Sequence, residues 1–178
     1  MIYDTDPYIY PAAFGNKRNA QKYLPSFIKA NTIFNYKNIL VAIQDNEIIG
    51  VSVIVTDNYS SNEEIQSVHC NTNSFSDVNE NYFTRIPSMV QNDQIYVMCI
   101  CVDKRNQGKG VGAALLNQIV KEYGDHDIAL DVLKENEKAI RLYRKFGFEI
   151  TSCKTGYSKS DIKPECYQMI RKKQARNV

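Results

Sequence analysis

The segment Ile95–Val120 joins an apolar run to a cluster of glycines and then to a helical pattern. Every residue of the run Ile95–Val102 is apolar, and most of them favour strands, which predicts a strand that is buried on both faces. Such a strand lies in the centre of a sheet. Apolar side chains recur at helical spacing from Val111 to Tyr123, and Gly124 is expected to end this helix in the C′ position. The rest of the chain must therefore be arranged around one strand–turn–helix unit.

Three of the chain's eight glycines, Gly108, Gly110 and Gly112, stand at the start of this helix. The first turn of a helix has unbonded backbone N–H groups and about half a positive elementary charge, so it attracts phosphate when side chains leave room. The glycine spacing therefore predicts a site for a phosphorylated ligand. A flexible turn without a ligand is the alternative interpretation.

The length and composition favour a single domain over residues 1–178. The chain has 178 residues, 43% of them hydrophobic, and no segment of linker composition, so it can bury one sizeable core. Its 22 basic and 20 acidic residues give a net charge of +2, which is too small to indicate nucleic acid or an acidic membrane surface as the main partner. No apolar run reaches the roughly 20 residues of a membrane helix, and the N-terminus has no signal-peptide pattern, so we expect a cytoplasmic protein.

The five cysteines are scattered along the chain, and Cys99 and Cys101 fall on one face of the predicted central strand. No histidine or second cysteine pair completes a metal site beside them. We therefore expect both thiols to pack in the core and the protein to hold no metal.

The N-terminal part of the chain predicts short elements followed by a hairpin. Residues 1–10 are tyrosine-rich and interrupted by proline, which favours an edge strand over a long helix. Asn16 is a candidate N-cap for a helix, and Pro25 is expected to break that helix, with a second short helix after it. The runs Ile39–Gln44 and Glu47–Val55 predict a hairpin because the Asp-Asn pair between them suits a two-residue turn.

A further strand and helix follow the central unit. The run Asp127–Leu133 predicts a strand, and the order strand, helix, strand makes this strand parallel to the central one. The next helix is predicted from a buried stripe at helical spacing and from the glycine that ends it. The stripe comprises Ala139, Leu142, Tyr143 and Phe146, and the glycine is Gly147.

Two more strands, predicted over residues 148–152 and 166–170 and antiparallel to each other, complete the sheet, and residues 171–178 are expected to form a solvated basic tail. Residues 56–93 are rich in Asn, Ser, Asp and Glu, with a helix predicted to begin at Ser76. A connection of this length is usually functional or mobile, so we expect an insertion that faces a substrate. A surface insertion without a function is the alternative.

Gln107, Gly110, Gly112 and Ala113 fit the pattern R/Q-x-x-G-x-G-A/G, and the segment NEKAIRLYRKFGF fits NxxAxxxYxxxGF. In this order and at this separation, the two blocks resemble the GNAT N-acetyltransferase superfamily over residues 93–150. The resemblance implies an α/β (α+β) fold with a mixed central sheet of about six or seven strands flanked by helices. Its central strands would be splayed to admit acetyl-CoA.

The resemblance also implies a site for acetyl-CoA as cosubstrate. The turn from Gln107 to Ala113 would wrap the pyrophosphate, and backbone groups of Ile100–Val102 would bond the pantetheine arm and the acetyl carbonyl. Asn136 would bond the same arm, although it could equally be only an N-cap. The residues so assigned to acetyl-CoA are Ile100, Cys101, Val102, Gln107, Gly108, Lys109, Gly110, Val111, Gly112, Ala113 and Asn136.

Tyr143 matches the tyrosine that gives a proton to the departing CoA thiolate in these enzymes as acetyl passes directly to an amine. A phenol with a pKa near 10 stays protonated at neutral pH, so the role is chemically reasonable, with core packing as the alternative. The acceptor amine must also lose a proton, yet the predicted central strand contains no carboxylate where some GNAT enzymes place a glutamate. The base is left unassigned, and its candidates are Asp93, Glu63, Glu64, Glu80 and His69.

Two other interpretations compete with an acetyltransferase. The glycines also fit G-x-G-x-x-A, and Asp131 follows at a spacing that suits a ribose-binding acid in a dinucleotide fold, although five polar residues between strand and glycines argue against this. A GNAT fold that only senses acyl-CoA is the non-enzymatic alternative. The acceptor, whether a small molecule or a protein amine, is left open, and a homodimer is expected only because dimers are common in the family.

Overall fold

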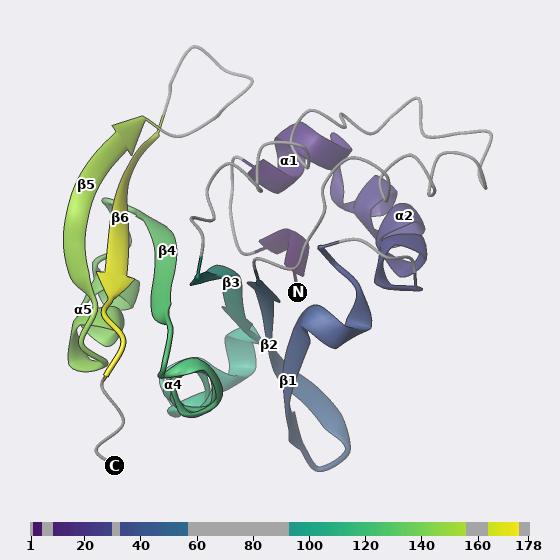
Figure 1. Cartoon of the computed structure of the whole chain (residues 1–178). Helices are drawn as coiled ribbons and strands as arrows, with labels where there is room; N and C mark the ends of the chain where they lie inside the picture. The colour runs from purple at the N-terminus through teal and green to yellow at the C-terminus, as the bar shows by residue number, and fades with distance from the viewer. Residues whose placement is uncertain (1, 5–8, 30–32, 57–92, 156–163, 175–178) are drawn as a thin grey trace.

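A computed structural model describes residues 2–4, 9–29, 33–56, 93–155 and 164–174. At its centre is a six-stranded sheet in the order β1-β2-β3-β4-β6-β5 (Figure 1). The strands are β1 (Ile39–Gln44), β2 (Glu47–Val55), β3 (Gln94–Val102), β4 (Asp127–Leu133), β5 (Glu149–Thr155) and β6 (Glu165–Arg171). Neighbouring strands are antiparallel except β3 and β4, which are parallel. This mixed sheet and the central position of β3 confirm the predicted fold class.

Helices pack on both faces of the sheet (Figure 1). The helices α1 (Ile9–Phe14) and α2 (Lys17–Lys29) cover one face, which we call the α1/α2 face and which holds Val53, Tyr96 and Ala129. The helices α4 (Val111–Tyr123) and α5 (Glu137–Lys145) cover the opposite α4/α5 face, which holds Ile54, Val97 and Leu130. The short 3-10 helices are η1 (Ile2–Asp4), η2 (Tyr36–Asn38) and η5 (Lys104–Asn106).

The N-terminal segment corrects two predictions. No strand forms in the described part of residues 1–10; η1 lies there, and α1 begins at Ile9 and buries Tyr10 and Phe14 in the core. Pro25 does not break α2, which runs unbroken to Lys29. A proline inside a helix costs about 3 kcal/mol, but α2 buries both Tyr23 and Phe27, and burial of each such large side chain returns about 1.5–3 kcal/mol. Tertiary packing therefore outweighs the local preference.

Predicted turns and caps are confirmed at two places and corrected at one. The Asn16 side chain accepts a hydrogen bond from the Asn19 N–H at 2.9 Å, as an N-cap does. Asp45 and Asn46 have φ angles of 51° and 61°, which the two-residue hairpin turn requires. Gly124 follows the last residue of α4 but has φ −67°, so it does not occupy the left-handed C′ position. A Cβ there would lie 2.5 Å from the Val120 carbonyl oxygen, so space demands this glycine.

The two central strands separate soon after they begin. β3 pairs with β4 only from Gln94–Asp127 to Tyr96–Ala129, although both strands continue well past this point. β3 also has a bulge, because Val53 pairs with Cys99 while the next residue of β2 pairs with Val97, which leaves Met98 as the extra residue. In Figure 1, β4, β6 and β5 accordingly stand apart from β1, β2 and β3. We call the region between residues 97–102 of β3 and 130–133 of β4 the central gap; it confirms the predicted splay.

The remaining predictions concern the C-terminal strands and the ends of the chain. β5 and β6 are antiparallel as predicted and longer than predicted. Arg171 ends β6 and is 6% exposed, so the basic tail begins only after it. The helix predicted from Ser76, like nearly all of the 56–93 insertion, lies outside the described residues. None of the helices described is long and apolar enough to span a membrane.

Candidate active site

The glycine turn leaves the N-terminus of α4 open. Gly108 and Gly110 have φ angles of 77° and 87°, a conformation that favours glycine, and a Cβ at either residue would meet no atom within 4 Å. Gly110 is the N-cap of α4, and no side chain caps the helix. The free N–H groups of the first turn therefore face open space, as a phosphate site requires. Gly112 differs, because a Cβ there would make ordinary contacts with Leu142 and Val102.

The turn lies at the end of β3, beside the central gap. The Gln107 side-chain amide donates to the Val102 carbonyl at 3.2 Å and ties the turn to the strand. Residues Ile100–Val102 pair with β2 on one side but lie beyond the last β3–β4 pair on the other. The backbone edge of these residues that faces β4 is thus without a strand partner. An extended ligand such as pantetheine needs a strand edge of this kind to form hydrogen bonds with the backbone. Lys109 is exposed, whereas Val111 and Ala113 are half-buried at the helix start.

Gly50 in β2 supports this turn, although it was not among the site residues predicted from the sequence. A Cβ at Gly50 would lie 2.9 Å from Val111 Cγ1 and 3.1 Å from Leu115 Cδ1, so α4 approaches the sheet more closely than any other residue there would permit. A single glycine inside an otherwise apolar strand is the signal that could have indicated this close approach.

Tyr143 packs on the α4/α5 face. Its ring packs against Phe148 with 5.9 Å between centroids. Burial, and after it the electrostatic effect of Cys99, raises the pKa of Tyr143 to about 12. Cys99 packs on the α1/α2 face, so this electrostatic effect acts across the sheet. Within the described part of the chain, the Tyr143 hydroxyl has no hydrogen-bond partner.

The two cysteines of β3 pack as expected. Cys99 is buried and Cys101 half-buried. Burial is the main cause that raises the pKa of Cys99 to about 12, so its thiolate is not accessible near neutral pH and it cannot serve as a nucleophile. No group of three or more His, Cys, Asp or Glu in the described residues could hold a metal ion.

Asn136 is an N-cap, as its alternative interpretation held. Its side-chain oxygen accepts a hydrogen bond from the Ala139 N–H at 3.2 Å at the start of α5. The assignment of Asn136 to the pantetheine arm stays a prediction.

Of the candidate bases, the structure describes Asp93, and this residue lies away from the gap. Asp93 precedes β3, at the end of the sheet opposite the gap, where its carboxylate lies 3.7 Å from His126 Nε2 and 3.4 Å from Lys173 Nζ. The other candidates, Glu63, Glu64, His69 and Glu80, lie outside the described residues. Asp131 was considered only as a ribose ligand, but it stands in the middle of β4 and not at a strand end.

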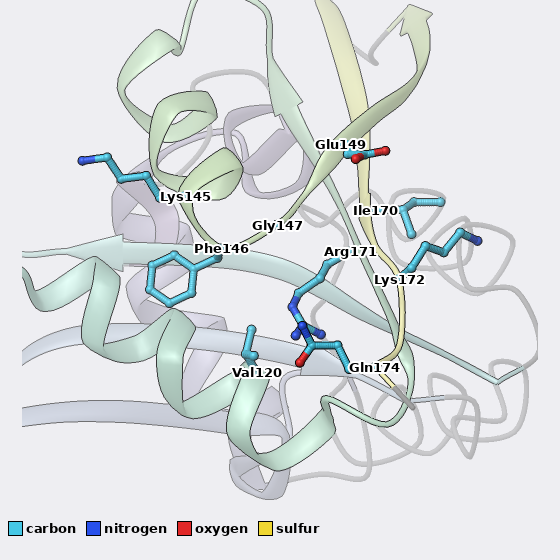
Figure 2. Close-up of a pocket in the computed structure, with 9 residues that line it drawn as sticks. All are labelled: Val120, Lys145, Phe146, Gly147, Glu149, Ile170, Arg171, Lys172 and Gln174. Atoms are coloured by element: carbon cyan, nitrogen blue, oxygen red, sulfur yellow. The ribbon is translucent and has the colours of Figure 1, made fainter. Parts of the chain in front are cut away.

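A cavity of about 410 Å³ lies elsewhere, between the C-terminal parts of α4 and α5 and the end of β6. Figure 2 shows the Arg171 guanidinium pointing toward Val120 and Gln174, whereas Lys145 and Lys172 point away. Among the described residues, the buried Arg171 Nη1 has no hydrogen-bond partner. Two helix C-termini, which carry partial negative charge, flank this cavity, so they stabilise the guanidinium itself and disfavour an anionic ligand.

Comparisons with known proteins agree with this geometry. A model of the acetyltransferase (GNAT) family matches residues 9–148. The spermine/spermidine N(1)-acetyltransferase of Bacillus subtilis is 33% identical over 63 residues, which cover 33% of this chain and 41% of that protein. The L-amino acid N-acetyltransferase AaaT of Escherichia coli is 38% identical over 55 residues, which cover 29% of this chain and 34% of that protein. The chain thus spans less than half the length of the curated relatives it matches.

Solved structures share the fold at low sequence identity. An N-acetyltransferase from Staphylococcus aureus Mu50 has a TM-score of 0.69 and 18% identity, with 95% of this chain and 87% of that chain covered. The ribosomal-protein-S18-alanine N-acetyltransferase of Escherichia coli has a TM-score of 0.54 and 16% identity, with 92% and 94% covered. With the family match over most of its length, the chain belongs to the GNAT acetyltransferase family.

Proposed function

We propose that the protein transfers an acetyl group from acetyl-CoA directly to a primary amine while both substrates are bound. The observation that carries this proposal is the central gap, which opens beside the uncapped N-terminus of α4. The Tyr143 hydroxyl would enter the same gap. A phosphorylated thioester that lies along the unpaired edge of β3 would place its sulfur within the same gap.

Each part of the site would supply one effect. The α4 N-terminus would bind the pyrophosphate, since its first-turn N–H groups are unblocked. Backbone N–H groups of Ile100–Val102 that face the gap would stabilise the charge that develops on the carbonyl oxygen, an effect of about 3 kcal/mol per donor in comparable sites. Tyr143 would hydrogen-bond the sulfur as it departs. Asn136 would hold the pantetheine arm through the amide hydrogens that its N-cap role leaves free.

Direct transfer is favoured over an acetylated enzyme. Cys99 is the cysteine that contributes to the raised pKa of Tyr143. The pKa of the Cys99 thiol is itself raised, so this thiol is protonated near neutral pH. A protonated thiol is a poor nucleophile, which favours attack of the amine itself on the thioester.

The acceptor is expected to be an amine of the kinds that the relatives' names indicate, a polyamine or an amino acid. The test measures release of CoA thiol from acetyl-CoA with spermidine, a set of L-amino acids, a lysine-containing peptide and an aminoglycoside. We expect thiol release with at least one amine and a raised melting temperature with acetyl-CoA but not with NAD. Thermal stabilisation without thiol release for any amine would favour an acyl-CoA sensor instead.

A further inference from the structure

Asp131 lies in the part of β4 that borders the central gap, and one of its carboxylate oxygens is buried without a hydrogen bond among the described residues. Its Oδ1 is buried and has no hydrogen-bond partner within the part of the chain that the structure describes. The Lys154 ammonium lies 3.6 Å from this oxygen, an ion-pair distance beyond hydrogen-bonding range. A buried acceptor without a hydrogen bond is destabilising, and more so when it is charged. The carboxylate is therefore poised to bind a further donor.

Neighbouring strands hold this carboxylate in place. The Tyr96 phenol of β3 donates a hydrogen bond to Asp131, and burial followed by the Asp131 charge raises the pKa of Tyr96 well above its usual range. On β6, Gln168 pairs in register with Asp131 and accepts a hydrogen bond from Ser152 at 3.4 Å. The titratable groups that act on Asp131 are thus Tyr96 from β3 and Lys154 from β5, and the Cys166 thiol from β6 acts on Tyr96.

The position of Asp131 along β4 places it beside the central gap. The last β3–β4 pair is Tyr96–Ala129, and Asp131 stands two residues further, or about 7 Å along the strand. Asp131 has the same parity as Ala129, which packs on the α1/α2 face, whereas Tyr143 packs on the α4/α5 face. The two side chains therefore belong to opposite faces of the sheet.

An amine acceptor needs such a group. An amine with a pKa near 10.4 is neutral in only about one molecule in two thousand at pH 7, and only the neutral form attacks a thioester. A carboxylate on the face opposite the tyrosine would attract the ammonium group of the substrate. It would also lower the free-energy cost of removing a proton from that ammonium. A neutral alcohol or thiol would gain less from a carboxylate at this position.

We propose that Asp131 binds the ammonium group of a cationic primary amine at Oδ1 and acts as the general base for its acetylation. This inference rests on the proposed acetyltransferase function. The ammonium gives one proton to Oδ1, and its nitrogen bonds to the acetyl carbon as the carbon–sulfur bond breaks. Tyr143 donates a hydrogen bond to the departing sulfur, which takes up the second proton of the nitrogen. The proton on Asp131 passes to solvent, so the products are the acetylated amine, CoA thiol and one released proton.

Lys154 tunes this carboxylate. Burial raises the pKa of Asp131, whereas the charge of Lys154 and a hydrogen bond from Tyr96 act in the opposite direction. Replacing Lys154 with methionine removes one of the lowering effects, so the acid limb of the pH–rate profile should move to higher pH. The same change leaves Oδ1 free for the acceptor, and turnover at pH 8 should be retained.

The test compares Asp131→Asn with Asp127→Asn. Asp127 is on the same strand and the same face and also pairs with a lysine, Lys172 at 2.8 Å, but it lies at the end of β4 opposite the gap. For each amine that the parent acetylates, kcat/KM is measured from pH 6 to 9.5, and acetyl-CoA binding is measured by thermal shift. Asp131→Asn should lower kcat/KM at least tenfold at pH 7 while Asp127→Asn changes it less than twofold, and both should bind acetyl-CoA like the parent.

The pH dependence separates a base from a structural residue. Without its base, the enzyme depends on the neutral amine in solution, so the Asp131→Asn defect should shrink by up to tenfold for each pH unit toward the amine's pKa. A defect of equal size at every pH, or turnover within twofold of the parent at pH 7, overturns the role of Asp131 and leaves the proposed function intact. A parent protein that releases no CoA thiol with any amine overturns the proposed function and this inference with it.

Discussion

Replacing Tyr143 with phenylalanine removes one hydroxyl group and keeps the ring that packs on Phe148. Because that hydroxyl has no hydrogen-bond partner among the described residues, its loss should leave the free energy of unfolding within about 1 kcal/mol of the parent. The variant should therefore fold, bind acetyl-CoA and show the same rise in melting temperature. Any change in turnover then reports on chemistry and not on structure.

The size of the expected loss follows from the raised pKa of Tyr143. A phenol with a pKa of about 12 is a weak acid beside a thiol with a reference pKa near 8.5, so complete proton transfer to a free thiolate is uphill by about 5 kcal/mol. Tyr143 should thus act mainly by donating a hydrogen bond while charge develops on sulfur. Hydrogen bonds to charged groups contribute about 1.5–3 kcal/mol, which corresponds to a 10- to 150-fold loss of turnover in Tyr143→Phe.

Steady-state thiol release at saturating substrates, checked by single-turnover rates, measures this loss. The loss should be of similar size from pH 7 to pH 9.5, because the hydrogen bond acts on charge that develops on sulfur and Tyr143, with a pKa of about 12, stays protonated throughout. Turnover within twofold of the parent at pH 7, with chemistry rate-limiting, would refute the reasoning and return Tyr143 to a packing role.

Four further variants test the fold around the site. Gly110→Asp should abolish the acetyl-CoA thermal shift, because a carboxylate at the α4 N-cap would repel the pyrophosphate, and an unchanged shift would contradict binding there. Gly50→Ala should lower the free energy of unfolding by about 1–3 kcal/mol through overlap with Val111, whereas Gly112→Ala, whose Cβ makes ordinary contacts, should change it little; equal effects in urea unfolding would count against this packing. Asn136→Ala should cost about 1 kcal/mol from loss of the N-cap, and no loss would show that the cap is not stabilising.

The elements around β3 were predictable from sequence because local and tertiary preferences agree there. The all-apolar β3, the amphipathic α4 and the hairpin turn at Asp45 and Asn46 each satisfy a local rule that the fold also needs. α2 and Gly124 were mispredicted because the deciding factors are contacts distant in sequence or a close backbone approach. The presence of a proline or a glycine in the sequence does not show whether a long-range contact or a close backbone approach decides its conformation.

The candidate site was only partly predictable for a similar reason. The glycine turn and Tyr143 stand in short sequence blocks, so their spacing carries the signal. The role proposed for Asp131 depends on Tyr96 on β3 and Lys154 on β5, and these residues come together with Asp131 only when the sheet forms. Gly50 depends on where α4 crosses β2. Such juxtapositions follow from strand order and register, which the sequence does not state.

The most direct test of direct acetyl transfer is a rapid-mixing experiment with excess protein and acetyl-CoA, followed by intact-protein mass spectrometry and analysis of the amine. Without an amine, the protein mass should stay unchanged because Cys99 is held as a thiol. With an accepted amine, one acetylated amine should form for each CoA thiol released, with no acetylated protein at any time. An acetylated protein that forms before the product and then decays at the rate of turnover would contradict the account.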